Sequence, residues 1–291
     1  MEWLRLTVDV AADDEDFVTA VLTESAPGGG CEILDRRAAL LVPDAGKLKP
    51  GRILVRLYLY PEHAEAAVIA ANGLEDAVLF PLEALSDEWK ENWKKFFKPT
   101  RVSERFVVRP PWEAHDAPLP TDIEIVIEPG MAFGTGTHET TRLCLRALDQ
   151  MMRPGLTVLD VGTGSGVLSV AAAKLGASRI VAIDVEADSL AATLENAERN
   201  GVAAVIAASL TPLEDVPGRF ELVVANILAT VLVEVSETLV PRLAPGGVLL
   251  LSGILDVDAG AVTAEYLRRG LEFMEQTQDR DWVALRFRAP S

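Results

Sequence analysis

The fold is decided by one stretch of the chain, Leu156-Thr-Val-Leu-Asp-Val-Gly-Thr-Gly-Ser-Gly166. An apolar run that ends in alternate glycines is typical of a buried strand that breaks into a tight turn. A helical pattern begins at about Val167, and the first N–H groups of a helix have no partners within it. Because glycine lets the backbone approach a ligand closely, the stretch predicts a loop that binds a nucleotide-type cofactor.

The spacing of the glycines distinguishes between cofactors. Gly162, Gly164 and Gly166 form G-x-G-x-G, one residue shorter than the G-x-G-x-x-G turn of dinucleotide enzymes. Asp160 comes two residues before the first glycine, where a carboxylate can pair with a cationic amino group. The next strand ends in Asp184, at the position that binds ribose hydroxyls in doubly wound folds. Together these residues predict S-adenosylmethionine as the cofactor, with a nicotinamide-dependent oxidoreductase as the weaker alternative.

Composition limits the classes of partner. The chain has 291 residues and a formal net charge of −17, which disfavours direct nucleic-acid readout or binding to an anionic membrane. An acidic enzyme can attract a basic partner, although solubility alone also explains the charge. Cys31 and Cys144 lie far apart and the three histidines are scattered, so we expect neither a disulfide nor a metal site. Without a signal segment or a long apolar run, we expect a cytoplasmic protein.

Residues 1–86 are expected to form a small α+β domain. Alternating apolar residues predict strands at 3–10, 31–34, 39–42, 53–60 and 78–81, and helical patterns cover 17–22 and 62–71. Asp13 and Asp14 are the expected caps of the first helix. The order β-α-β-β-α-β is that of a ferredoxin-like module. Because the segment carries no catalytic constellation, we interpret it as a substrate-recognition or packing domain.

Residues 87–104 are expected to connect two domains. The segment includes Trp89-Lys-Glu-Asn-Trp-Lys-Lys-Phe-Phe-Lys98, whose aromatic residues recur at helical spacing with four lysines among them. A basic aromatic patch that contacts substrate or nucleic acid is one interpretation. The favoured one is an amphipathic connector docked on the catalytic domain.

Residues 105–291 are expected to form the catalytic domain. A strand at 122–128 is followed by a loop rich in Gly and Thr at 129–141. Such a loop offers hydroxyls and free N–H groups, which favours a role in ligand binding. Its candidate cofactor contacts are Phe133, Thr137 and Thr141. A helix follows, for which Thr140 or Thr141 is the expected cap.

Strands and helices then alternate from Leu156 onward. The expected strands run at 156–161, 179–184, 203–208, 220–225 and 248–252. A helix is expected after each of them except the third, which a loop follows, and the helix after the fourth strand reaches Leu243. This alternation predicts a parallel sheet with short crossovers. Two closing strands at 271–277 and 282–288 predict an antiparallel hairpin at its edge. The predicted fold class is α/β, a class I S-adenosylmethionine methyltransferase with a Rossmann-like doubly wound sheet, preceded by the ferredoxin-like domain.

Asn226 and Ile227 are the candidate catalytic residues. Asn226 follows the fourth strand, at the sheet edge where ligands bind in such folds. Its side-chain oxygen and the carbonyl of Ile227 can accept hydrogens from an amine and direct its lone pair. Capping of the next helix is the alternative role for Asn226. His138 is expected to stabilise the loop rather than to act as a base.

Four motifs and the segment 89–98 resemble the PrmA family, the bacterial methyltransferases of protein eleven of the large ribosomal subunit. The motifs are Phe133-Gly-Thr-Gly-Thr-His-Glu-Thr-Thr141, Asp160-Val-Gly-Thr-Gly-Ser-Gly166, Asn196-Ala-Glu-Arg-Asn-Gly201 and Val224-Ala-Asn-Ile-Leu-Ala229. The resemblance covers nearly the whole chain. It implies methylation of the N-terminal α-amino group and lysine ε-amino groups of that basic ribosomal protein. It also implies that the N-terminal module recognises the substrate and moves on its linker.

By position, the resemblance implies cofactor contacts at Thr141, Gly162, Asp184 and Asn226. The chain departs from methyltransferases in general at the end of the third strand. Ala208-Ser209 lacks the acid that often binds the adenine amino group, so backbone carbonyls are expected to take its place.

Two further classes of function stay open. In methyltransferases of nucleic-acid base amines, the equivalent of Asn226 begins an Asn-Pro-Pro-Tyr tetrapeptide. Here Ile227 and Leu228 replace the prolines, and Ala229 replaces the aromatic residue that would stack on a flipped base. A ribosome-assembly or scaffold protein without catalysis is the remaining alternative.

Overall fold

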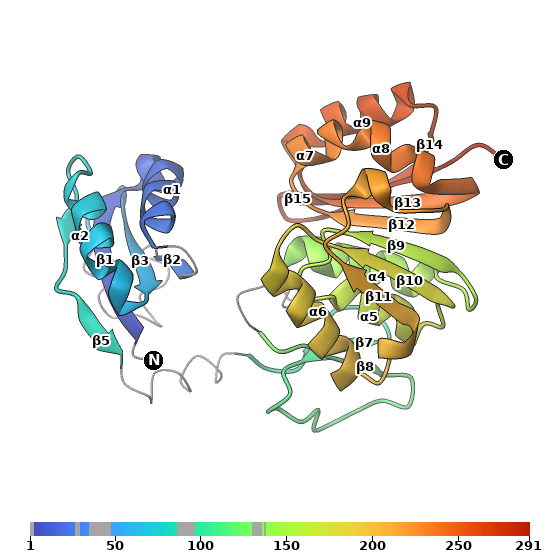
Figure 1. Ribbon diagram of the computed structural model, residues 1–291, viewed down its shortest axis with the longest axis horizontal. Helices are drawn as coiled ribbons and strands as arrows, with labels where there is room; N and C mark the ends of the chain where they lie inside the picture. The colour runs from blue at the N-terminus through green and yellow to red at the C-terminus, as the bar shows by residue number, and fades with distance from the viewer. Residues whose placement is uncertain (1–2, 27–29, 35–47, 86–96, 130–135, 137) are drawn as a thin grey trace. The chain divides into compact units, whose positions relative to one another are not determined.

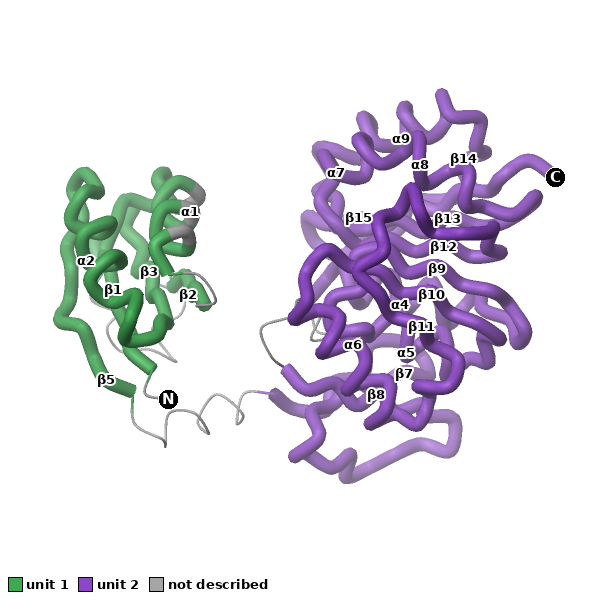
Figure 2. The backbone as a smooth tube through the Cα atoms, in the orientation of Figure 1, with its two compact units in different colours: residues 1–96 green, residues 97–291 purple. Residues whose placement is uncertain are grey.

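The chain forms two compact units, residues 1–96 and residues 97–291 (Figure 2). The computed structural model describes residues 3–26, 30–34, 48–85, 97–129, 136 and 138–291. The predicted connector at 87–104 spans the boundary, and its aromatic and lysine-rich part at 86–96 lies outside the described residues. Thr100 and Arg101 form a short strand of the second unit. The functional division into a recognition domain, a connector and a catalytic domain therefore stays a prediction.

The first unit contains an antiparallel sheet and two helices. Its elements are β1 (Trp3–Ala11), α1 (Glu15–Ser25), β2 (Gly30–Leu34), β3 (Arg52–Leu59), α2 (Ala64–Asn72), β4 (Val78–Leu79) and β5 (Glu83–Leu85). The strand order is β2-β3-β1-β4, and β5 also pairs with β1; each pairing is antiparallel. The assignment of this unit to a ferredoxin-like module stays a prediction. The strand predicted at 39–42 lies outside the described residues.

Alternation along the central strands builds the core of this unit. Leu6, Val8 and Val10 of β1 are buried together with apolar residues of β3 and of both helices. Asp14 occupies the N-cap position of α1, as predicted, but its side chain makes no capping bond, and residues 12–14 form a turn of 3-10 helix.

The second unit is built on a seven-stranded sheet (Figure 1). Its strands are β9 (Thr157–Val161), β10 (Arg179–Ile183), β11 (Ile206–Ser209), β12 (Phe220–Asn226), β13 (Leu243–Leu255), β14 (Glu272–Asp279) and β15 (Trp282–Arg288). The order is β11-β10-β9-β12-β13-β15-β14, and β9 to β13 run parallel. The closing hairpin is antiparallel, as predicted, with β15 inserted between β13 and β14.

Helices cover both faces of this sheet (Figure 1). They are α4 (Glu139–Met151), α5 (Val167–Lys174), α6 (Ala187–Arg199), α7 (Ala229–Glu234), α8 (Ser236–Leu239) and α9 (Ala259–Arg268). Successive residues of β9 serve opposite faces: Val158 packs with α4 and α5, whereas Leu159 packs with α7 and α9. The single helix predicted up to Leu243 is wrong, because α7 and α8 are separate and β13 begins at that residue.

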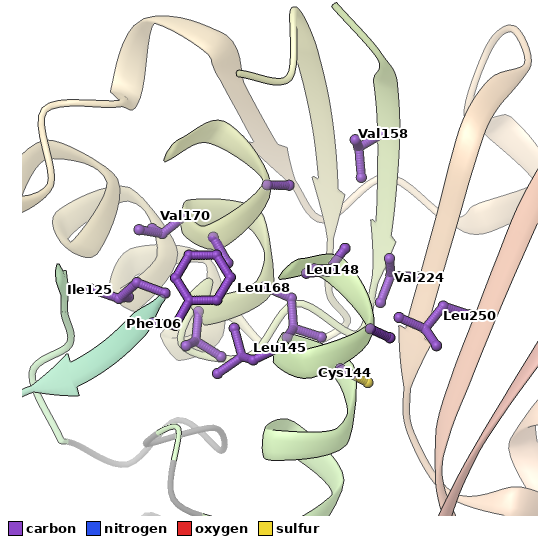
Figure 3. Packing of buried hydrophobic residues seen from close by; sticks show 14 of the residues in the cluster. Phe106, Ile125, Cys144, Leu145, Leu148, Val158, Leu168, Val170, Val224 and Leu250 are labelled. Carbon is purple, nitrogen blue, oxygen red and sulfur yellow. The ribbon is translucent and has the colours of Figure 1, made fainter. Parts of the chain in front are cut away.

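A small third sheet lies beside α4 and α5. It consists of β6 (Thr100–Arg101), β7 (Phe106–Arg109) and β8 (Ile123–Val126), of which only β8 was expected from the sequence. Phe106 and Ile125 are fully buried in the same cluster as Leu145 and Val170 (Figure 3). None of the described helices is both long and apolar enough to cross a membrane.

Candidate active site

Three of the predicted site residues end neighbouring strands in one row. Val161 of β9 pairs with the last residue of β10 and with the penultimate residue of β12. The next residues, Gly162, Asp184 and Asn226, therefore lie side by side at the carboxyl edge of the sheet. The chain runs outward from β9 to β10 and β11 and then crosses back to β12. The row thus lies at the topological switch point, where open α/β sheets bind ligands.

The glycine turn connects β9 to α5 in a conformation that side chains disfavour. Gly162, Gly164 and Gly166 have φ values of +71°, +54° and +79°, in the left-handed region that glycine tolerates. The N–H groups of Gly162 and Thr163 donate to the carbonyl of Ile183, at 2.9 and 3.1 Å. α5 begins directly behind the turn at Val167, as predicted.

Asp184 braces this turn. Its Oδ2 accepts a hydrogen bond from the N–H of Gly164 at 2.8 Å, and its Oδ1 accepts one from the N–H of Glu186 at 3.0 Å. Each carboxylate oxygen has a second lone pair for a further donor such as a hydroxyl. Sequence reasoning gave Asp184 a role toward ligand alone and missed its structural role.

Asp160 is a buried carboxylate with one oxygen unpaired. The side chain is 1% exposed and lies on the α4–α5 face of β9. Its Oδ2 accepts hydrogen bonds from Thr163 Oγ1 at 2.9 Å and from Ser169 Oγ at 2.6 Å. Its Oδ1 is buried and has no partner among the described residues. Burial raises the pKa of Asp160, and the charge of Asp184 acts in the same direction, whereas the hydroxyl donors oppose the shift.

A second unpaired oxygen belongs to Asn226. Its Nδ2 donates to Oγ1 of Thr141 at 3.5 Å, and Thr141 is fully buried at the start of α4. Its Oδ1 is buried and lacks a partner among the residues described. Asn226 does not cap the next helix, because Leu228 occupies the N-cap position of α7 without a side-chain bond. The amide oxygen is therefore an available acceptor at the end of β12.

The start of α4 differs from the prediction. His138 is the N-cap, and its Nδ1 accepts from the N–H of Thr140 at 3.3 Å, so neither Thr140 nor Thr141 caps the helix. The His138 ring also meets Trp282 edge to face, with centroids 5.2 Å apart. This agrees with the expected stabilising role. Phe133 and Thr137 lie outside the described residues.

The edge hairpin holds α4 in place. Arg142 Nη2 lies 3.0 Å from Oδ2 of Asp279, the last residue of β14, and Arg146 Nη1 lies 3.2 Å from the same oxygen. Both arginines come from α4. The hairpin thereby positions the helix that carries Thr141, a link that spans over 130 residues and leaves no local pattern in the sequence.

Comparison with known proteins identifies the family. A sequence model of the family described as "Ribosomal protein L11 methyltransferase (PrmA)" matches residues 2–290. The chain belongs to this family. A ribosomal protein L11 methyltransferase of Geobacter metallireducens is 46% identical over 299 residues, covering 99% of this chain and 98% of the relative. One of Pelotomaculum thermopropionicum is 40% identical over 313 residues and covers 98% of each.

A solved structure supports the same assignment. The ribosomal protein L11 methylase of Lactobacillus delbrueckii subsp. bulgaricus is 33% identical, with a TM-score of 0.63. The match covers 67% of this chain and 100% of that one. The L11 methyltransferase family and the class I methyltransferase fold thus agree with the predictions from the sequence.

The Asn-rich motif of the L11 methyltransferase family has a structural role in this chain. Asn196 Nδ2 donates to the carbonyl of Ser165 in the glycine turn at 2.9 Å, and its Oδ1 accepts from the N–H of Glu128 at 3.1 Å. Asn200 exchanges two hydrogen bonds with the backbone of Val126, at 2.7 and 2.9 Å. The α6 helix therefore fixes both the cofactor turn and the end of β8. In the sequence, this motif contributed only to the family resemblance, and we predicted no structural role for its residues.

We expect Asn196→Ala to destabilise the second unit. Asn196 is 1% exposed, and its removal takes away the hydrogen-bond partner of the buried Ser165 carbonyl and of the part-buried N–H of Glu128, which costs about 1–3 kcal/mol. Chemical denaturation followed by circular dichroism measures the loss. Asn72→Ala, an exposed change on α2, is the matched control and should stay within about 0.5 kcal/mol of the wild type. Equal losses in the two variants would contradict the role of Asn196.

Proposed function

We propose that this chain is an S-adenosylmethionine-dependent methyltransferase that acts on the N-terminal α-amino group and lysine ε-amino groups of ribosomal protein L11. The observation that carries the proposal is a pair of buried oxygens at the switch point of the sheet, Asp160 Oδ1 and Asn226 Oδ1, which have no partner among the residues that the structure describes. Buried polar atoms without partners are rare, and a bound ligand is one way to satisfy them. One oxygen suits a cationic amino group, and the other suits the hydrogens of a neutral amine. Membership of the L11 methyltransferase family supports both assignments.

The residues present fit S-adenosylmethionine. Asp160 Oδ1 would accept from the cofactor's ammonium group, which would stabilise the charged carboxylate. Asp184 would accept from ribose hydroxyls with its remaining lone pairs. Val185, which follows Asp184, and Leu210, which follows the last residue of β11, are 90% and 46% exposed and would contact the apolar faces of the adenine. β11 ends in Ser209, where many methyltransferases have the acid that binds the adenine amino group. The Ser209 carbonyl accepts from Asp184 N at 3.3 Å, and the Ser209 hydroxyl donates to Thr211 Oγ1.

The chain's own residues would align and desolvate the acceptor amine. Bound S-adenosylmethionine supplies an already activated methyl group. Asn226 Oδ1 and the Ile227 carbonyl would accept the amine's hydrogens and thereby direct its lone pair. Both acceptors are neutral, so they do not stabilise the ammonium form as a carboxylate would. A lysine has a pKa of about 10.4 in water, and desolvation in the closed site would lower it.

The substrate is inferred from charge and family together. A net charge of −17 favours encounter with a basic protein and disfavours a polyanion. The relatives that match nearly the full chain are named ribosomal protein L11 methyltransferases. We extend the proposal to the ferredoxin-like unit as the part that recognises L11, with residues 87–104 as the connector.

Transfer to ribosomes tests the proposal. The purified chain is incubated with methyl-labelled S-adenosylmethionine and with ribosomes from cells that lack the enzyme, and intact-mass spectrometry identifies the labelled component. We expect L11 to gain mass in multiples of one methyl group. Label in RNA would instead support a base-amine methyltransferase. Firm cofactor binding without any transfer would overturn the proposed substrate, and tight binding of NAD in place of S-adenosylhomocysteine would overturn the cofactor.

A further inference from the structure

Ile227 is held between two glycines, one in the turn after β9 and one in β13. A Cβ added to Gly162, in the cofactor turn, would overlap Cγ2 of Ile227. A Cβ added to Gly253, in β13, would overlap the carbonyl oxygen of Ile227 and lie 2.8 Å from its carbonyl carbon and 3.0 Å from its nitrogen. The side chain therefore rests on one glycine and the backbone on the other, and neither position has space for an alanine.

Gly253 lies at an irregularity in the sheet. Ser252 pairs with Asn226 of β12, so Gly253 comes next to Ile227 where the pairing of the two strands ends. On its other side, β13 shifts register against β15 between Leu251 and Ile254. Gly253 has a φ of +82°. Bulges of this kind redirect a strand next to active sites, and a positive φ favours glycine there.

A buried hydrogen bond fixes the position of this bulge. Ser252 is fully buried, and its Oγ donates to the carbonyl of Val283 at 3.0 Å. β15 thus holds the residue immediately before Gly253. The surface against which Ile227 packs is therefore rigid.

We infer that Gly253 is a positioning residue for methyl transfer, which sets the Asn226–Ile227 backbone by allowing the Ile227 carbonyl to lie directly against β13. Gly162 contacts Ile227 from the side of the cofactor turn, and we call Gly162 and Gly253 together the clamp. The clamp places the two amine acceptors at a fixed distance from the cofactor turn. This inference rests on the proposed function of those acceptors. Displacement by about 1 Å in such a site can lower the rate about 10²-fold.

Gly253→Ala and Gly246→Ala form a matched pair that tests this role. Gly246 lies in the same strand with a similar φ of +70°, but an added Cβ would meet nothing closer than Ser291 Oγ at 3.9 Å. We expect Gly253→Ala to lower kcat for L11 about 10²-fold, with the KM for L11 and the dissociation constant of S-adenosylhomocysteine changed far less. Gly246→Ala should keep the wild-type kcat. A kcat loss shared equally by both variants, or a loss matched by an equal loss of cofactor affinity, would overturn the inference.

A rescue experiment tests the packing of Ile227 from the side of Gly162, and this arm is informative even where Gly253→Ala does not fold. The overlap at Gly162 is with the Ile227 side chain, whereas the overlap at Gly253 is with the Ile227 backbone. Ile227→Ala should therefore raise the activity of Gly162→Ala but should not raise that of Gly253→Ala. The clamp is wrong if Ile227→Ala fails to relieve Gly162→Ala, or if it restores Gly253→Ala.

The wild-type chain separates this inference from the proposed function. If the wild type transfers no methyl group to L11, the proposed function fails. If the wild type is active and Gly253→Ala equals Gly246→Ala, the positioning role alone fails.

Discussion

Asn226→Ala is expected to lower kcat for methyl transfer to L11 by about 10²-fold or more, because alignment of the substrate amine depends on the side-chain amide oxygen of Asn226. The buried Asn226 Oδ1 lacks a partner among the described residues, while Nδ2 already bonds Thr141. The change removes the acceptor and leaves the glycine turn and the braces on Asp184 intact. Steady-state kinetics together with calorimetric titration of S-adenosylhomocysteine measure the two effects separately. Cofactor affinity should fall much less than kcat.

Asn226→Asp is the control for the chemical nature of this acceptor. It keeps an oxygen in place but adds a negative charge, which stabilises the ammonium form of the substrate. The pH at which transfer reaches half its maximal rate should therefore rise relative to the wild type. Equal losses of kcat and cofactor affinity in Asn226→Ala would contradict the alignment role and assign Asn226 to cofactor binding alone.

Asp160→Asn is expected to weaken binding of S-adenosylmethionine by about 2–5 kcal/mol, the usual effect of removing one partner of a buried charge pair. The amide has nearly the shape of the carboxylate and can still accept hydrogen bonds from Thr163 and Ser169. What it lacks is the charge that faces the cofactor's ammonium group. Methylthioadenosine, which has no amino acid portion, is the matched ligand and should bind both proteins about equally well.

The same change should stabilise the free protein. Burial raises the folded-state pKa of Asp160 above its unfolded value of about 3.9. The contribution of Asp160 is therefore fully present below that pH and is lost as pH rises through the folded pKa. Asparagine does not titrate, so at neutral pH the variant should unfold at a higher temperature than the wild type. A variant that melts lower and binds both ligands equally weakly would show a structural role instead.

The sequence predicted most of the second unit because its signals are local. The apolar run that ends in three alternate glycines at 162–166 produced β9, the turn and the start of α5 at the expected residues. The short β6 and β7 were missed because prolines and polar residues surround them, and their stability comes from Phe106, which packs against helices distant in sequence. The N-cap of α4 was missed because histidine is not among the usual capping residues.

Contacts between distant segments could not be predicted. The carboxylate of Asp184 was expected to face only ligand, yet it also accepts the N–H of Gly164, twenty residues away. Gly253 lies in an ordinary apolar strand pattern, and only the register between β12 and β13 places it against Ile227. The unpaired state of Asp160 Oδ1 likewise depends on how α4 and α5 bury β9.

The most direct test of this account is a crystal structure of the full chain with S-adenosylhomocysteine. The account predicts that the ligand's amino group lies within about 2.7–3.2 Å of Asp160 Oδ1. It also predicts ribose hydroxyls on Asp184 and the sulfur facing Asn226. A ligand whose amino group is held elsewhere, with Asp160 Oδ1 still unpaired, would contradict it.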